Sequence, residues 1–204
     1  MLSTNKPILL GLALSCIVGI INPTVAADES VIPTGWEMKG SRPNDYLVMI
    51  DPQQKRDGKP ILIMQSKTSP IDGFGTVMQK ISTEKYLGKR LRFSADVKSE
   101  NVVDAAGIWM RVDAGSGNTI ALDNMEKRPI KGNNDWKNYS VVLDVSPRGT
   151  QVCIGILTHS TGKIWVSNLK LEEVGKDVPV TDILNKDENP TAPVNLDFTQ
   201  GTNK

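Results

Sequence analysis

LRFSADVK, residues 91–98, decides the fold of this chain because it alternates strictly between apolar and polar side chains. Such period-two alternation predicts a β-strand with one face on a hydrophobic core and the other toward solvent. The apolar face consists of Leu91, Phe93, Ala95 and Val97. NYSVVLDV (138–145) and GKIWVSNLKLEEV (162–174) alternate in the same way, so the pattern recurs along the chain.

Short apolar segments of this kind are separated by turn residues such as DG, GSGN, KGNND and SPRGT. The predicted strands are Gly35–Lys39, Tyr46–Asp51, Pro60–Ser66, Gly75–Ser82, Leu91–Lys98, Ala105–Asp113, Asn118–Asp123, Asn138–Val145, Val152–Thr158 and Lys163–Val174. Their spacing predicts an all-β sandwich of two antiparallel sheets. STEKYLG (82–88) and Thr181–Asn185 are the only helical suggestions, each of one or two turns.

The first 26 residues have the pattern of a secretory signal peptide. Lys6 precedes the apolar segment ILLGLALSCIVGII, and small residues lead to a predicted cleavage after Ala26. A membrane anchor is the alternative, but the apolar segment is shorter than the ~20 residues that a span needs. A lipoprotein attached through Cys16 is a second alternative, although Ala13-Leu14-Ser15 is a poor lipobox. We therefore expect a periplasmic or secreted protein.

The predicted mature chain carries equal numbers of basic and acidic residues, because the signal peptide holds one lysine and no acidic residue. Nucleic acid is thus not an expected partner, since its binding depends on a basic surface. Cys153 remains as the one mature cysteine, which excludes an intramolecular disulfide and a thiolate metal cluster. Its apolar setting, VCIGIL, favours a small core residue over a nucleophile.

Three regions follow from these patterns: a signal peptide (1–26), a sandwich domain (33–175) and a C-terminal extension (176–204). KDVPVTDILNKDENPTAP (176–193) is polar and rich in proline, but VNLDFTQ (194–200) alternates again. We interpret the extension as ending in a strand that packs back on the sandwich. The start of another module is the competing interpretation.

The order of segments resembles the galactose-binding-like jelly-roll sandwiches, which include carbohydrate-binding modules of secreted glycosidases. The resemblance rests on GFGTVMQKIS (73–82), YLGKRLRFSADVKSE (86–100), AGIWMRVD (106–113), DWKNYSVVLDV (135–145) and TGKIWVSNLKLEEV (161–174). ALDNMEKRPIKG (121–132) and DVPVTD (177–182) further resemble a group of uncharacterised bacterial proteins, some labelled transcriptional regulators. No helix-turn-helix pattern or basic surface accompanies that label here.

The resemblance implies a jelly roll, a non-catalytic role and, in many members, a structural calcium ion held by an Asp-Asp pair on the last strand. This chain has Ser167-Asn168 there. A neutral amide oxygen is a weaker ligand for a hard cation than a carboxylate. No cofactor is therefore expected, with structural calcium as the one open possibility.

Trp109 and Arg111 are the main candidates for ligand binding. Both fall on the strand face opposite Ile108, Met110 and Val112. Tryptophan can stack on a sugar ring, and arginine can bond vicinal hydroxyls as a planar fork. The alternative is that Trp109 packs under a loop while Arg111 pairs with a nearby aspartate.

Four further residues complete the predicted ligand site. Asp123 and Asn124 could accept hydroxyl protons at a rim or could hold the loop through Asx turns. Arg128 could reach over Trp109 or point to solvent. Gln79 lies on the apolar face of its strand, where a polar group needs a partner, either a ligand or a core hydrogen bond.

Other residues favour structural roles. Trp36, Trp136 and Trp165 are expected to pack, and the single histidine, His159, to lie at a turn near a cleft edge. No GxSxG motif or metal-ligand cluster accompanies that histidine. Glycosidase chemistry needs two facing carboxylates, which sequence alone can neither assemble nor exclude.

The sequence therefore predicts a non-catalytic module that binds a carbohydrate or a similar polar ligand. A structural or protein-interaction module of the cell envelope is the alternative, and a small hydrolase is a weaker one. A cleft floored by Trp109 favours ligand binding, whereas an apolar patch, or a cleft filled by the C-terminal extension, favours interaction with protein.

Overall fold

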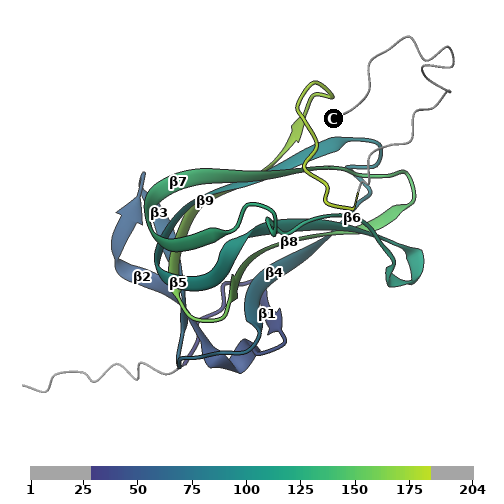
Figure 1. Cartoon of the computed structure of the whole chain (residues 1–204). Coiled ribbons are helices and arrows are strands. Elements are labelled where there is room, and N and C mark those ends of the chain that lie inside the picture. The colour runs from purple at the N-terminus through teal and green to yellow at the C-terminus, as the bar shows by residue number, and fades with distance from the viewer. Residues whose placement is uncertain (1–28, 185–204) are drawn as a thin grey trace, which may run out of the picture.

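The computed structural model describes residues 29–184, which form nine β-strands and two short 3₁₀ turns (Figure 1). The strands are β1 (Glu37–Gly40), β2 (Tyr46–Arg56), β3 (Lys59–Ser66), β4 (Phe74–Ser82), β5 (Arg90–Ala114), β6 (Thr119–Asp123), β7 (Ile130–Asp144), β8 (Gly149–His159) and β9 (Lys163–Val174). The 3₁₀ turns are Pro43–Asp45 and Gly115–Gly117. STEKYLG (82–88), for which the sequence suggests a short helix, forms the end of β4 and a series of turns with no helix.

The strands form two antiparallel layers joined through β5. One layer has the order β2-β3-β9-β5-β7, and the other has the order β1-β4-β8-β5-β6. Figure 1 shows β7, β9 and β3 in one layer and β1, β4 and β8 in the other. This arrangement confirms the predicted all-β sandwich.

β5 is a single strand of 25 residues where the sequence predicts two. Its first half pairs with β7 and β9, and its second half, from Ala105, pairs with β8 and β6. The prediction of a break between Lys98 and Ala105 was wrong because the polar residues there bend the strand without ending it. Asn101 takes a left-handed conformation at the bend, which asparagine tolerates better than most residues.

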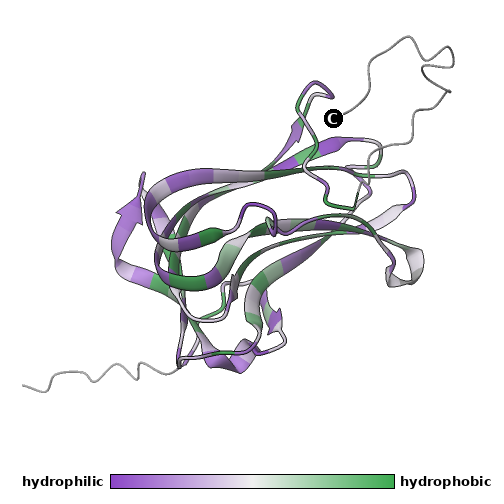
Figure 2. Ribbon diagram, viewed as in Figure 1, coloured by the Kyte–Doolittle hydropathy of each residue, from purple (hydrophilic) through white to green (hydrophobic). Residues whose placement is uncertain are grey.

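The core lies between the layers and is built from the alternating residues that the sequence identifies. Leu91, Phe93, Ala95 and Val97 are fully buried, and so are Ile108, Met110 and Val112 from the second half of β5. Figure 2 shows hydrophilic and hydrophobic residues alternating along these strands. Because alternate residues face inward, the intervening residues of β5 form the outer surfaces of both layers.

The chain after β9 forms an ordered strap, which we define as residues 176–184. Arg90 fixes its beginning by donating to the carbonyl oxygens of Lys176 and Val178 while pairing with Asp144. Further on, the Thr181 amide donates to the Val142 carbonyl oxygen over 2.8 Å. The strap thus crosses from β7 toward β6, without the helix suggested for Thr181–Asn185 in its described part.

Two sequence interpretations lie outside the described residues. These are the signal peptide over 1–26 and the returning strand at 194–200. Within residues 29–184 there is no helix of the length and apolarity needed to cross a membrane.

Candidate functional site

A groove crosses the outer face of the β1-β4-β8-β5-β6 layer where the sequence places Trp109. This Trp109 groove has a volume of about 500 Å³. Its lining is Phe74, Thr76, Trp109, Arg111, Thr119, Leu122, Asn124, Leu157 and Leu184. A second lobe continues past Phe74, Asn124 and Leu157 toward Asp104, Glu126 and His159. The layer therefore carries one extended groove with an apolar middle.

Trp109 lies in the floor of this groove but offers little of its ring. Its side chain is 7% exposed and packs with Met78, Cys153 and Leu157. The indole N–H donates to the Thr76 hydroxyl oxygen over 2.8 Å. Phe74 is the aromatic residue of the groove that reaches solvent, at 37% exposure, and its position between two glycines at the start of a strand does not by itself indicate a site residue.

The Arg111 side chain is partly engaged by an ion pair within the protein. Its guanidinium donates to Asp113 Oδ2 over 3.1 and 2.8 Å, while its side chain remains 36% exposed. Asp113 also accepts a hydrogen bond from Thr119. Burial raises the pKa of the neighbouring Cys153 thiol, which agrees with a packing residue and not a nucleophile.

The buried carboxylate of Asp123 pairs with the exposed side chain of Arg128 next to the groove. Asp123 is 0% exposed, and its carboxylate accepts from Arg128 Nη1 over 3.1 Å and from the Met125 amide over 2.8 Å. Arg128 also donates to the Ser140 carbonyl oxygen. Asn124 lines the groove while its Oδ1 accepts from the Glu126 amide, in an Asx turn. The pair is positioned to fix this loop and not to meet a ligand directly.

The remaining candidates lie apart from Trp109 or at the groove's end. Gln79 projects from the opposite face of β4, since its neighbour Met78 packs with Trp109. His159 lines the second lobe, where its Nδ1 is 2.6 Å from Asp104 Oδ2. The structure thus brings Trp109, Arg111 and Asn124 together and leaves Gln79, Asp123 and Arg128 outside the groove lining. Their roles in ligand binding stay predictions.

Because Gly155 has no Cβ, the Trp109 ring can pack closely against β8. A Cβ at residue 155 would lie 2.5 Å from Trp109 Nε1 and 2.9 Å from the Val77 carbonyl oxygen. We expect Gly155→Ala to lower the free energy of unfolding by ~1–3 kcal/mol in urea denaturation, as overpacking does elsewhere. Gly115→Ala is the control, because a Cβ there meets no atom within 4 Å. Equal stability of the two variants would contradict the placement of the ring.

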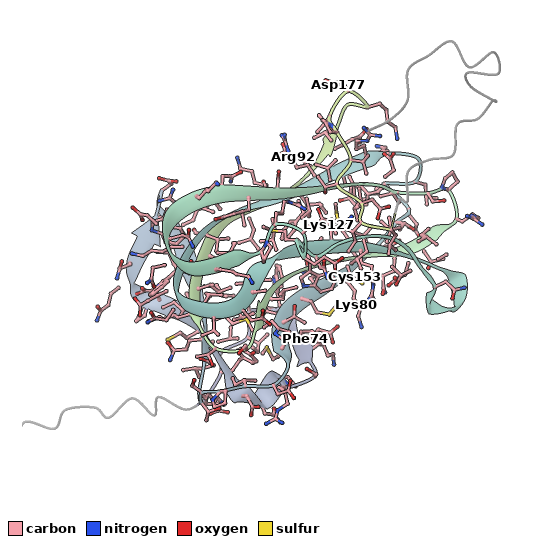
Figure 3. The ribbon with its side chains drawn as sticks, in the orientation of Figure 1. Phe74, Lys80, Arg92, Lys127, Cys153 and Asp177 are labelled. Atoms are coloured by element: carbon pink, nitrogen blue, oxygen red, sulfur yellow. The ribbon has the colours of Figure 1, made fainter. Side chains whose placement is uncertain are left out.

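A second groove lies on the outer face of the β2-β3-β9-β5-β7 layer, and the sequence did not single it out. This Asp96 groove has a volume of about 540 Å³. Its lining is Asp57, Lys59, Arg92, Ser94, Asp96, Asn138, Ser140, Asn168, Lys170 and Glu172. Figure 3 shows Arg92 on this layer and Phe74, Lys80 and Cys153 on the other. Every lining side chain is polar or charged, in contrast to the Trp109 groove.

Hydrogen bonds fix the centre of the Asp96 groove. The Asn168 amide donates to Asp96 over 2.9 Å, Asn138 donates over 2.9 Å and Arg56 donates over 2.8 Å. The Asn168 hydrogen bond, with those of Asn138 and Arg56, lowers the pKa of Asp96 to about 2. Arg56 also stacks over the Trp136 ring at 4.7 Å, so an aromatic side chain supports this charge network.

The same contacts show whether the residues of the last strand could hold a structural calcium ion. Asn168 donates its amide hydrogens to Asp57 and Asp96, and Arg56 already balances the Asp96 charge. Within residues 29–184 no group of three or more His, Cys, Asp or Glu side chains is arranged to hold a metal ion. The residues at this position therefore do not fit a calcium ion.

The lining also holds cations without a carboxylate partner. Arg92 pairs with Glu172 at 3.0 Å, but Lys59 and Lys170 have no ion-pair partner among the described residues. With Ser94 and Ser140, the groove offers donors and acceptors from β3, β5, β7 and β9. Sequence alone shows these as ordinary outward positions of alternating strands, so only the pairing of four strands reveals them as one surface.

A Bacillus subtilis protein matches most of this chain in sequence. The chain is similar to the uncharacterised HTH-type transcriptional regulator YbfP of Bacillus subtilis (strain 168), with 35% identity over 171 residues. That match covers 83% of this chain and 58% of the relative, so the chain spans little more than half of that protein's length. A search against protein-family models finds no match.

Solved structures with this fold include carbohydrate-binding modules. The CBM22-1 xylan-binding domain of Paenibacillus barcinonensis Xyn10C aligns with a TM-score of 0.52 and 14% identity, over 72% of this chain and 90% of that one. A family 30 carbohydrate-binding module aligns with a TM-score of 0.51 and 13% identity, over 72% of this chain and 96% of the other. These likenesses confirm the predicted jelly-roll sandwich.

Proposed function

We propose that the domain is a non-catalytic binding module that holds a carbohydrate or a similar polar ligand in the Asp96 groove. The observation that carries the proposal is the uniformly polar lining of this groove, with Asp96 fixed by three hydrogen-bond donors. Sugar hydroxyls donate and accept hydrogen bonds, and pre-positioned partners of both kinds bind them without a large ordering cost. The xylan-binding domain named above has the same fold, which supports the ligand class by analogy alone.

The roles within the groove follow from charge and exposure. Arg92, Lys59 and Lys170 supply donors, while Asp96 and Glu172 supply acceptors. A shallow groove buries little area, so a dissociation constant on the order of a micromolar to a millimolar is expected. The proposal includes export to the periplasm or outside the cell, as the first 26 residues predict.

A glycan array with paired variants tests both the ligand class and the face that binds it. We expect Arg92→Met to weaken glycan binding by about tenfold or more, since a charge-assisted hydrogen bond contributes ~1.5–3 kcal/mol. Lys89→Met is the matched control, because Lys89 pairs with Glu173 at 2.7 Å and does not line the groove. Phe74→Ala and Arg111→Met should leave binding unchanged.

Three outcomes of the array would contradict the proposal. Absence of binding to any glycan removes the ligand class. Loss of binding in Phe74→Ala or Arg111→Met, with Arg92→Met unaffected, places the ligand on the predicted face of Trp109. Release of soluble sugar from a bound glycan contradicts a non-catalytic role and points to Asp104 and Glu126, the two carboxylates of the second lobe.

A further inference from the structure

The strap ends at the edge of the Trp109 groove. The Ile183 amide donates to the Leu122 carbonyl oxygen over 2.8 Å, and the Leu122 amide donates back to Asp182 Oδ1 over 3.0 Å. Leu184, the next residue, lines the groove beside Trp109 and Arg111 and is 44% exposed. The described chain therefore ends at a residue that lines this groove.

The groove offers an apolar surface that its own side chains leave uncovered. Phe74 and Leu184 are exposed there, and Leu157 and Leu122 lie between them. Arg111, at the same end as Leu184, contributes a partly exposed positive charge. An occupant that suits this lining has apolar side chains on one face and an acidic group nearby.

VNLDFTQ, residues 194–200, has this composition. Val194, Leu196 and Phe198 share one face of an extended segment, and Asp197 lies between two of them. Nine residues separate Leu184 from Val194, which allows a reach of up to ~30 Å at ~3.3–3.6 Å per residue. The segment can therefore return over the groove from its point of attachment.

We propose that Val194–Phe198 docks in the Trp109 groove as an intramolecular occupant, with Leu196 and Phe198 against Phe74 and Leu157. Tethering favours this contact because a short linker holds the segment at an effective concentration on the order of millimolar. The apolar faces of both partners leave water together, which is the driving force for docking. Under this arrangement the segment occupies the Trp109 groove, and the Asp96 groove lies on the other layer.

The three phenylalanines of the chain provide a direct test. Labelling the full chain with fluorophenylalanine gives ¹⁹F signals from Phe74 in the groove, Phe93 in the core and Phe198 in the docking segment. We expect the Phe198 signal to be displaced from the position of a solvated ring. Leu196→Asp should return it to that position and should shift the Phe74 signal as well, while Phe93 stays unchanged.

Asn195→Asp is the matched control, since it adds the same charge on the opposite face of the segment and should change neither signal. In the reciprocal experiment, Phe74→Ala should move the Phe198 signal toward the solvated position. A solvated Phe198 signal in the unaltered chain overturns the proposal. A displaced Phe198 signal that ignores Phe74→Ala also overturns it, because the segment then contacts another surface. None of these readouts depends on carbohydrate binding.

Discussion

Arg128→Met is expected to lower the free energy of unfolding by about 3 kcal/mol. The substitution removes the guanidinium from Asp123, a fully buried carboxylate that then keeps the Met125 amide as its one donor within residues 29–184. Removing one partner of a fully buried ion pair costs ~3–5 kcal/mol because the remaining charge is uncompensated, and in this pair Asp123 is the buried member that would remain. The 40% exposure of the Arg128 side chain places the expected value at the lower end of that range. Urea denaturation of the two proteins measures the difference.

Lys127→Met provides the control for Arg128→Met. Lys127 occupies the same loop, is exposed and has no ion-pair partner among the described residues, so its replacement should change stability by less than ~0.5 kcal/mol. The double variant Asp123→Asn with Arg128→Met should recover part of the loss, since no buried charge then remains. If Arg128→Met were as stable as Lys127→Met, the pair would not hold the loop.

Asp96→Asn is expected to flatten the acid end of the stability curve. In the folded protein the pKa of Asp96 is about 2, chiefly through the Asn168 hydrogen bond, against about 3.9 for an unfolded aspartate. A lowered folded-state pKa adds stability above the unfolded value, and this stability is lost as the pH falls through about 2. At ~1.36 kcal/mol per pKa unit, the carboxylate contributes about 2.6 kcal/mol at neutral pH, most of which is lost by pH 2.

The measurement compares unfolding free energies of the natural chain and Asp96→Asn between pH 2 and 6. The difference between them should shrink by about 2 kcal/mol as the pH falls from 5 to 2. Asp144, whose pKa Arg90 also lowers to about 2, titrates in both proteins and cancels in the comparison. A constant difference for Asp96→Asn would mean that the carboxylate is not held in this network.

Strand alternation predicted the architecture because burial imposes a period of two wherever one face of a sheet meets a core. Lys163–Val174 matches β9 at both ends, and the Asp57-Gly58 turn joins β2 to β3 with both residues at positive φ. The continuity of β5 could not be predicted from the sequence, because the polar residues near Asn101 are typical of a loop. The strands that pair with these residues and hold them extended lie far away in the sequence. The same limit applies to β7, which begins eight residues before its predicted start.

The candidate site was harder to predict because an outward residue and a covered one look alike in sequence. Trp109 does lie on the outer face, yet Met78 and Leu157 from neighbouring strands cover it. In LRFSADVK, Asp96 has the pattern of an ordinary solvated residue, and its three partners lie 40 or more residues away in the chain. Spatial convergence of this kind depends on strand order, which the alternation of single strands does not specify.

The continuity of β5 has a consequence for how this protein can change over generations. One strand presents Arg92, Ser94 and Asp96 to one outer surface and Trp109 and Arg111 to the other, while the residues between them fill the core. Substitution at these outward positions can alter either surface and leave the packing intact. A single inserted or deleted residue would instead exchange inside for outside along the part of the strand on one side of the change. The register shifts between Val97 and Ala106 already switch the inward residues from odd to even numbers, so this bend is where the strand can absorb a change of length.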